Sequence, residues 1–314
     1  MHCKITDNMK ISDIILGGDY IGTLVDKKTA FNMFDIFKDQ GGTCIDTANL
    51  YTNGLSEEIL GEWLKKSGRD KIFVSTKGGH PNPETMNISR LSKKELEADL
   101  NQSLKRLSTD YADIYFLHRD DTSKPVGEII ETLNTFINQG KIKSLGASNW
   151  TAKRIAEANL YAREKGLKGF SFSQIKYSLA QTNPDYCDDP TLVEMNEGEY
   201  EFYQKSKVAV FAFASQGKGF FSKLAMGEEF LSPKSKERYY CTENLKRFKA
   251  VEEIKNKYHI SSAATVLAYV YSDKNINASA IIGAKNKIQL SDCLSASNFV
   301  LTPEEIEYLK NGCI

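Results

Sequence analysis

"IFVSTKGG" at residues 72–79, "SKKELEADLNQSLKRL" at 92–107 and "ADIYFLH" at 112–118 follow one another and decide the fold. The first and third runs are short and apolar, with many β-branched or aromatic residues, which is typical of buried strands. The middle run repeats apolar residues at helical spacing, and Ser92 with Glu95 predicts a capping box at its start. A strand, a helix and a strand in this order indicate parallel strands joined by a helical crossover.

The same alternation extends along the whole chain. Strands that are buried on both faces of a parallel sheet read as continuous apolar runs, and eight such runs are present. Besides the two above, they are "DIILGG" (13–18), "TCIDTA" (43–48), "IKSLGASN" (142–149), "GFSFSQI" (169–175), "VAVFAFAS" (208–215) and "ASAIIGA" (278–284). Helical patterns separate nearly all of them. Eight β/α units predict an α/β fold of the (β/α)8 TIM-barrel type.

The alternative architecture is an open, doubly wound sheet. A dinucleotide site in such a sheet carries a Gly-x-Gly-x-x-Gly fingerprint after the first strand, and this chain has none there. No Gly/Ser/Pro-rich linker or break in composition divides the sequence. We therefore expect residues 1–314 to form a single domain.

Composition excludes several classes of function. The chain has 41 basic and 41 acidic residues and a formal net charge of zero, so it lacks the basic footprint of a nucleic-acid-binding protein. No apolar run approaches the roughly 20 residues of a membrane span, and the polar N-terminus is unlike a secretory signal. The six cysteines show no metal-binding spacing and are expected to be reduced thiols of a cytoplasmic protein.

Polar side chains stand where four consecutive strands end. Asp46 closes the second strand run, Tyr51 follows in its loop, and the next three strands end in Lys77, His118 and the pair Ser148–Asn149. Each of these residues alone is most simply explained as a solvated loop residue. In a β/α barrel, however, the active site lies at the C-terminal ends of the strands. Four such endings in succession therefore indicate a catalytic site.

The chemistry of this set suits the protonation of a carbonyl oxygen as a hydride reaches its carbon. A neighbouring ammonium is expected to lower the pKa of the Tyr51 phenol, and a carboxylate holds Lys77 charged and in place. A histidine such as His118 can orient a carbonyl oxygen by a hydrogen bond. Nucleophilic catalysis fits poorly, because no serine or cysteine lies beside a candidate base.

The order and spacing of these motifs resemble those of the aldo-keto reductases over nearly the whole chain. The stretches that carry the resemblance are "GGTCIDTANLYTNGLSEEILGEWL" (41–64), "VSTKGG" (74–79), "YADIYFLHRDD" (111–121), "GKIKSLGASNW" (140–150), "FSQIKYSL" (172–179), "FAFASQGKGFFS" (211–222) and "IIGAKNKIQLSDCL" (281–294). The resemblance implies a catalytic tetrad with Tyr51 as general acid/base. Lys77 and Asp46 would tune the tyrosine, and His118 would orient the carbonyl.

The resemblance also implies NADP(H) as cofactor, with NAD(H) as an alternative. Ser148, Asn149 and Gln174 would bind the nicotinamide carboxamide, and Phe213 would stack on the ring. The stretch that would cover the pyrophosphate comprises Gly217, Lys218 and Gly219. The last motif would contribute Gly283, Lys285, Asn286, Gln289 and Asp292 around the 2′-phosphate and adenine. Cys293 departs from the family's usual asparagine, which puts one adenine contact in doubt.

The expected function is the NADPH-dependent and reversible reduction of an aldehyde or ketone. One alternative is a regulatory or binding subunit, like the potassium-channel β-subunits that this barrel also resembles. The intact tetrad and the lack of an N-terminal inactivating extension favour the enzyme. The second alternative is a metal-dependent barrel hydrolase or isomerase that uses Asp120 and Asp121 beside His118. Because no second strand-end histidine completes such a site, no metal is expected.

The substrate is less well defined by the sequence. No long C-terminal loop closes the pocket, so its walls are expected to come from Tyr20, from "HPNPETMNISR" (80–90) with His80, from Arg119 and from residues 177–200. These walls are more polar than aromatic. They favour a small, polar carbonyl compound over a steroid. The sequence predicts no nucleic-acid or membrane partner and gives no oligomeric state.

Overall fold

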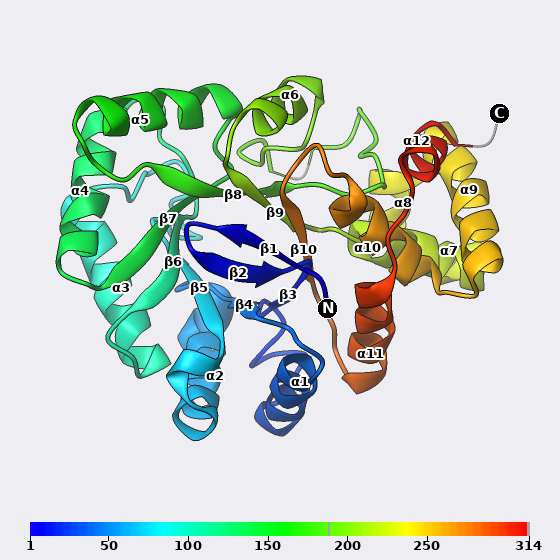
Figure 1. Cartoon of the computed structure of the whole chain (residues 1–314), viewed down its shortest axis with the longest axis horizontal. Helices are drawn as coiled ribbons and strands as arrows, with labels where there is room; N and C mark the ends of the chain where they lie inside the picture. Colours follow the sequence, from blue (N-terminus) through cyan, green and yellow to red (C-terminus); the bar gives the residue numbers. More distant parts are fainter. Residues whose placement is uncertain (188, 313–314) are drawn as a thin grey trace.

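A closed barrel of eight parallel strands forms the centre of the computed structural model, which describes residues 1–187 and 189–312 (Figure 1). β10 pairs with β3 on one side and with β9 on the other, which closes the sheet. All eight predicted strand runs are confirmed, and the TIM barrel with them. The strands are β3 (Ile14–Gly17), β4 (Cys44–Asp46), β5 (Phe73–Gly78), β6 (Ala112–Leu117), β7 (Ile142–Ser148), β8 (Phe170–Lys176), β9 (Ala209–Phe213) and β10 (Ala278–Ile282).

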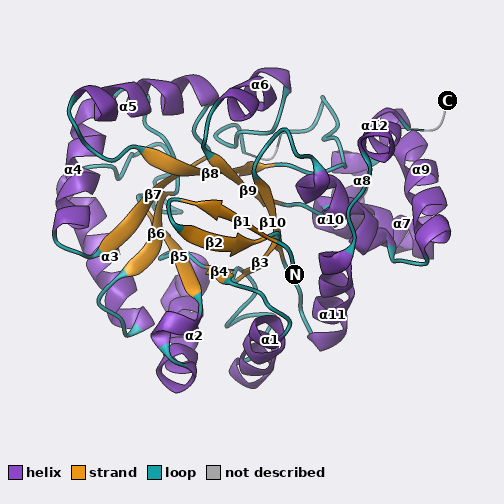
Figure 2. Cartoon of the chain, in the orientation of Figure 1, coloured by secondary structure: helices purple, strands orange, loops and turns teal. Residues whose placement is uncertain are grey.

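Helices surround the barrel on its outer face (Figure 2). Their apolar faces cover the strands, and the capping box of Ser92 and Glu95 starts α3 as predicted. The connecting helices are α1 (Lys27–Asp39), α2 (Leu55–Ser67), α3 (Lys93–Leu107), α4 (Val126–Asn138), α5 (Ala152–Glu164), α6 (Glu197–Lys205), α10 (Ser262–Ser272) and α11 (Lys287–Ser295).

Additional helices extend the region between β9 and β10 and the C-terminal region. They are α7 (Phe220–Met226), α8 (Pro233–Tyr239), α9 (Thr242–Tyr258) and α12 (Pro303–Asn311). α12 packs against α9 beside the barrel (Figure 1). Three of these helices, α7, α8 and α9, lie between β9 and α10. The loop after β9, which carries the predicted pyrophosphate segment, is thus followed directly by these additional helices.

An antiparallel hairpin of β1 (Cys3–Thr6) and β2 (Met9–Ser12) lies across the N-terminal end of the barrel (Figure 1). The sequence predicted only a polar N-terminus here, and neither strand was among the predicted ones. Met9 and Ile11 are buried against barrel residues such as Phe172. Their alternation with exposed residues is the pattern of a half-buried strand, so the hairpin closes the bottom of the barrel.

The described cysteines Cys3, Cys44, Cys187, Cys241 and Cys293 are free thiols, and Cys313 lies outside the described residues. In the described part of the chain no helix has both the length and the apolar character to cross a membrane. The cytoplasmic location stays a prediction.

Candidate active site

A buried ion pair joins β4 and β5 at the C-terminal end of the barrel. Lys77 Nζ lies 2.6 Å from Asp46 Oδ2 and donates a second hydrogen bond of 2.8 Å to the Thr47 carbonyl oxygen. The Lys77 side chain is fully buried, and that of Asp46 is 3% exposed. A buried charge without a partner is strongly destabilising, so each of these two groups requires the other.

Tyr51 lies in the short helical turn η1 (Tyr51–Gly54) that follows β4. Its hydroxyl oxygen is 3.1 Å from Lys77 Nζ, and the same nitrogen lies 4.6 Å from the centre of the phenol ring. The ring remains partly exposed at the mouth of the barrel. The Lys77 ammonium therefore bridges the strand-end carboxylate of Asp46 and the phenol of Tyr51.

The electrostatics around Tyr51 correct the expectation that Lys77 lowers the pKa of the phenol. The pKa of Tyr51 is raised above its usual value of 10.0, because burial of the phenol outweighs the lowering effect of Lys77. Burial alone would lower the pKa of Lys77, but the negative charge of Asp46, with a contribution from Tyr51, raises it above 10.5. Lys77 is therefore charged and Tyr51 protonated near neutral pH.

His118 follows β6 and is buried beside the tyrosine. Its ring meets that of Tyr51 edge to face, with the ring centres 5.9 Å apart. Burial lowers the pKa of His118 well below 6.5, and the nearby charge of Lys77 lowers it further, so the imidazole is neutral. Its Nδ1 atom is buried and has no hydrogen-bond partner among the described residues. A neutral imidazole can donate one hydrogen bond to a carbonyl oxygen.

Two further side chains hold the carboxylate of Asp46. Ser75 Oγ donates a hydrogen bond of 2.6 Å to Asp46 Oδ1, and Gln174 Nε2 donates one of 3.1 Å to the same oxygen. Gln174 was predicted to contact the nicotinamide, and its amide nitrogen here contacts the tetrad. The role of Ser75 was missed. Its position two residues before Lys77 on one strand places both side chains on the barrel's inner face, which was a usable signal.

Two of the predicted nicotinamide-binding residues end the strands on either side of β8. Ser148 is the last residue of β7 and Phe213 the last of β9. Asn149 has a left-handed backbone with φ of 58°. Its Nδ2 donates to Ser148 Oγ at 3.1 Å, and its Oδ1 accepts from the backbone N–H of Val193 at 3.2 Å. The amide is thereby fixed between β7 and the loop after β8.

The predicted pyrophosphate segment is η3 (Gly217–Gly219), where Gly217, Lys218 and Gly219 have φ values of 55°, 54° and 77°. A Cβ at Gly217 would lie 2.6 Å from the Cβ of Ala180, so only glycine fits there. The backbone N–H groups of Gly217 and Gly219 donate to the carbonyl oxygens of Ala214 at 2.8 Å and Gln216 at 2.9 Å, so these two amides are engaged within the turn itself.

The predicted 2′-phosphate residues surround the start of α11. The Asn286 carboxamide oxygen caps this helix by accepting from the N–H groups of Ile288 and Gln289, each at 3.0 Å. Gln289 Oε1 accepts from the Lys285 backbone N–H at 2.9 Å. Burial lowers the pKa of Lys223, and the positive charge of Lys285 lowers it further. Lys223 Nζ donates to the carbonyl oxygen of Lys218 at 3.0 Å, which places this lysine, absent from the sequence-based prediction, beside the predicted pyrophosphate segment.

The remaining residues of the predicted cofactor site lie around Tyr20 and on α11. A Cβ at Gly283 would lie 2.8 Å from the Tyr20 ring, and Lys285 Nζ is 5.5 Å from the centre of that ring. Tyr20, predicted for the substrate pocket, thus lies beside the residues predicted for the cofactor. Asp292 is partly exposed on α11, and the neighbouring Cys293 Sγ accepts from Gln216 Nε2 at 3.3 Å.

Arg119 is engaged in contacts with the protein itself. Its guanidinium donates to the carbonyl oxygen of His118 at 2.9 Å, to Thr191 Oγ1 at 3.0 Å and to Asp189 Oδ2 at 3.0 Å. Arg119 thus ties the loop after β8 to the end of β6. Asp120, considered above as a metal ligand, accepts from Arg154 Nε at 3.2 Å. No group of three or more His, Cys, Asp or Glu side chains within the described ranges is arranged to hold a metal ion.

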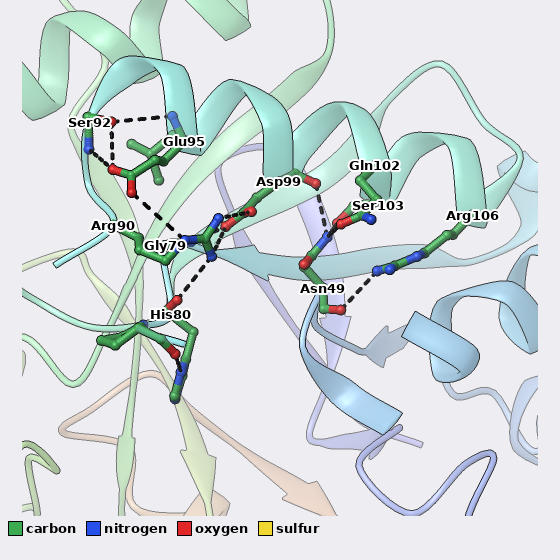
Figure 3. Close-up of polar contacts among 12 residues, drawn as sticks. Asn49, Gly79, His80, Arg90, Ser92, Glu95, Asp99, Gln102, Ser103 and Arg106 are labelled. Carbon is green, nitrogen blue, oxygen red and sulfur yellow. Dashed lines mark hydrogen bonds and ion pairs between the residues drawn. The ribbon is translucent and has the colours of Figure 1, made fainter. Parts of the chain in front are cut away.

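A polar pocket of about 180 Å³ lies beside Lys77 and His118. Its walls include His80 from the loop after β5 and Gln102 from α3 (Figure 3). The His80 ring meets that of His118 edge to face, with centres 4.7 Å apart. Arg90 also lines the pocket, but its charge is paired with Asp99 at 2.6 Å. His80 and Arg90 of the 80–90 segment thus line a polar pocket beside Lys77 and His118, and their role toward a substrate stays a prediction.

Comparison with known proteins agrees with this geometry. A sequence model described as "Aldo/keto reductase family" matches residues 13–312. An aryl-alcohol dehydrogenase of Pestalotiopsis microspora is 30% identical over 322 residues, covering 97% of this chain and 79% of that protein. A putative aryl-alcohol dehydrogenase of Saccharomyces cerevisiae is 31% identical over 336 residues, covering 98% of this chain and 84% of that protein.

A solved structure of a thermostable aldo-keto reductase superposes with a TM-score of 0.74 over 99% of both chains, and its 24% identity supports the same fold. The family acts on small-molecule carbonyl or alcohol substrates with a nicotinamide cofactor. Sequence, barrel and family match lead to one conclusion: the chain belongs to the aldo/keto reductase family and is an oxidoreductase that acts on CH–OH or carbonyl groups.

Proposed function

We propose that the chain catalyses the reversible, NADPH-dependent reduction of an aldehyde or ketone, with Tyr51 as the proton donor. The observation that carries this proposal is the continuous contact from Asp46 through the Lys77 ammonium to the Tyr51 hydroxyl, with neutral His118 at the side of the phenol. The nicotinamide, when bound, supplies the hydride. Every other role below belongs to side chains of the protein.

Tyr51 gives its proton to the carbonyl oxygen as the carbon is reduced. Lys77 stabilises the phenolate that remains, since a charge 3.1 Å away favours the ionised form. Asp46 keeps Lys77 charged and fixes its position. His118, held neutral by its buried surroundings, donates a hydrogen bond to the carbonyl oxygen. In the reverse direction the Tyr51 phenolate takes the proton of the alcohol.

The residues around the proposed cofactor site fit NADP(H). The left-handed turn of Gly217, Lys218 and Gly219 would cover the pyrophosphate, and the close packing of Ala180 requires glycine at 217. Lys285 lies just before α11, and its positive charge lowers the pKa of Lys223, whose Nζ donates to the carbonyl oxygen of Lys218 in the proposed pyrophosphate segment. Like charges repel each other, so a bound phosphate dianion would relieve the repulsion as well as form ion pairs. We therefore propose Lys223 as an additional contact to the 2′-phosphate, with Ser148, Asn149, Gln174 and Phe213 serving the nicotinamide.

The proposed substrate is a compact carbonyl compound that carries polar groups. The polar walls of the pocket beside His118 and His80 support this choice. Two relatives carry the name aryl-alcohol dehydrogenase, which makes hydroxylated aromatic aldehydes the first compounds to test. Arg119 orients the wall through Asp189 and Thr191, so we propose no direct substrate contact for its guanidinium.

The test is steady-state oxidation of NADPH with a panel of hydroxylated and unsubstituted benzaldehydes, sugars and keto acids. We expect turnover with at least one aldehyde, preference for hydroxylated members, and no effect of a chelator. Cofactor binding without turnover across the panel would favour the regulatory-subunit alternative. Activity that a chelator abolishes and that needs no nicotinamide would instead support the hydrolase or isomerase alternative.

A further inference from the structure

The turn that carries Tyr51 has an unusual backbone. Its next three residues, Thr52, Asn53 and Gly54, all have left-handed conformations, with φ values of 49°, 55° and 91°. Such a conformation is unfavourable for residues with a side chain, and especially for a β-branched residue such as threonine. Strained backbone of this kind persists only where surrounding groups hold it in place. Thr52 Oγ1 is one such group, since it donates to the carbonyl oxygen of Ile21 at 3.0 Å and accepts from the N–H of Ser56 at 2.9 Å. The groups that hold this turn also determine where the phenol of Tyr51 lies.

Arg106 on α3 contacts this turn at both ends, and Figure 3 shows its contact with Asn49. Its Nη1 donates to the carbonyl oxygen of Asn49 at 3.0 Å, and its Nη2 donates to the carbonyl oxygen of Asn53 at 3.5 Å. A Cβ at Gly54 would overlap the guanidinium. The glycine is therefore required both by its φ and by the close approach of Arg106.

Glu57 forms an ion pair with Arg106 and fixes its position. Its carboxylate is fully buried, and its Oε2 lies 3.3 Å from Arg106 Nη1. Its Oε1 accepts a hydrogen bond of 2.7 Å from Thr76 Oγ1, and Thr76 directly precedes Lys77 on β5. The guanidinium is thus fixed to the same strand that positions the ammonium partner of Tyr51.

Asn49 adds a second attachment of the turn to α3 (Figure 3). Its Nδ2 donates to the carbonyl oxygen of Asp99 at 3.2 Å and to Gln102 Oε1 at 3.0 Å. With these contacts the start of the turn stays attached to α3 if the arginine is replaced. Loss of the guanidinium should then loosen the later residues of the turn and leave the helix and the barrel in place.

We infer that Arg106 is a positioning residue that holds the hydroxyl of Tyr51 against Lys77 by clamping residues 49–54 onto α3. The inference rests on the proposed catalytic function of Tyr51. A planar guanidinium can serve two carbonyl oxygens and a carboxylate at once, whereas a lysine ammonium in the same place lacks this forked geometry. Arg106→Lys should therefore keep the charge beside Glu57 and lose much of the clamp.

Arg69 offers a matched control at the other end of the barrel, just before β5. Its side chain is 18% exposed, against 17% for Arg106, and is paired with the nearly buried Asp113. It also donates to two backbone carbonyl oxygens, of Ile72 and Tyr111. Arg69→Lys thus imposes a similar loss of structural contacts far from the phenol.

The experiment measures kcat, KM, NADPH affinity and thermal stability for Arg106→Lys, Arg69→Lys and wild type. For Arg106→Lys we expect kcat to fall by roughly 10- to 100-fold, because small displacements of a reacting group have effects of that order. NADPH affinity should stay within about twofold, since Arg106 lies away from the proposed cofactor residues. Arg69→Lys should retain wild-type kcat even where it lowers thermal stability as much.

A readout that needs no turnover follows Tyr51 directly. Tyrosine labelled with 13C at Cζ gives one NMR resonance per ring, and Tyr51→Phe identifies the resonance of Tyr51. We expect its titration to be displaced in Arg106→Lys and unchanged in Arg69→Lys. Guanidinium ion at non-denaturing concentration should restore part of the rate to Arg106→Ala. If that variant does not fold, Arg106→Lys decides the question.

Two outcomes would overturn the inference. One is a folded Arg106→Lys protein with wild-type kcat and an unmoved Tyr51 titration. The other is an equal loss of kcat in Arg69→Lys, which would show a general effect of stability. Failure of the proposed function is a separate result, seen when the wild-type protein turns over no carbonyl compound while the Tyr51 resonance still responds to Arg106→Lys.

Discussion

The hydroxyl oxygen of Tyr51 lies 3.1 Å from the ammonium nitrogen of Lys77 at the C-terminal end of the barrel. The ammonium is fully buried and is held by Asp46 at 2.6 Å. A buried cation at this distance stabilises the phenolate more than it stabilises the phenol, so its effect is greatest after the proton has left. This relationship supports the proposal that Tyr51, although protonated at rest, serves as the acid.

Tyr51→Phe removes the proposed proton donor and keeps the ring. We expect the rate of carbonyl reduction to fall by about 10²- to 10⁴-fold, the usual size of general acid catalysis. NADPH affinity should change by no more than a few-fold, which fluorescence titration measures. Most of the wild-type turnover surviving in this variant would remove Tyr51 from its role.

Asp46→Asn keeps the shape of the side chain and removes the charge that compensates Lys77. The amide nitrogen would also face the donors Ser75 and Gln174, so one oxygen acceptor is lost or must rotate. We expect a lower rate with cofactor binding largely retained, because a buried ammonium without its partner is costly. The pH–rate profile of alcohol oxidation should be displaced, since the charge state of Lys77 controls Tyr51. A wild-type rate with an unmoved profile would mean that Asp46 only ends the strand.

The raised pKa of Tyr51 predicts opposite pH behaviour for the two directions. Reduction requires the protonated phenol, so its rate should be nearly constant from about pH 6.5 to 9, below the usual tyrosine pKa of about 10. Oxidation requires the phenolate, so its rate should rise about tenfold per pH unit over the same range. These slopes are to be measured on kcat with saturating cofactor. An oxidation rate that levels off near pH 7 would show that Lys77 lowers the phenol pKa far more than burial raises it.

Lys285→Ala should weaken NADPH more than NADH. A charge-assisted contact to a phosphate contributes roughly 1.5–3 kcal/mol, or about 10- to 150-fold in affinity. Lys223→Ala should have the same selectivity, because Lys223 Nζ contacts the proposed pyrophosphate segment and its charge interacts with that of Lys285. Lys205→Ala, on the exposed face of α6, is the control and should affect neither cofactor. Equal losses for NADPH and NADH in fluorescence titration would argue against a 2′-phosphate contact.

The hairpin at the bottom of the barrel should contribute stability without contributing to catalysis. Ile11 is 2% exposed and packs into the barrel interior, so Ile11→Ala should cost about 2–5 kcal/mol of unfolding free energy. Ile5 on the same hairpin is 75% exposed, and Ile5→Ala should change stability by no more than about 0.5 kcal/mol. Denaturant unfolding measures both. Equal costs for the two substitutions would show that the hairpin does not close the barrel.

The local pattern of apolar and polar residues determined most of the secondary structure of this protein. Continuous apolar runs and helical periodicity are properties of neighbouring residues, so the eight strands and the helix at 92–107 could be read directly from the sequence. In a β/α barrel the C-terminal ends of the strands meet at one end, so the sequence also predicts that Asp46, Lys77 and His118 lie close together. The sequence prediction did not include the hairpin, whose turn is formed by Asp7 and Asn8 with φ of 48° and 64°. The polar residues of the N-terminus make the alternation of buried and exposed positions in its strands hard to recognise.

Only the tertiary structure decided how these groups behave. The pKa of Tyr51 rises because burial outweighs one adjacent charge, and burial is a sum over many distant segments. Arg119 is occupied by Asp189, 70 residues away, and Arg106 reaches Asn49 across 57 residues. No sequence period encodes such contacts. They arise when separate β/α units close into one barrel. The sequence could therefore indicate the reaction, but only the folded chain shows which groups hold Tyr51, the proposed proton donor.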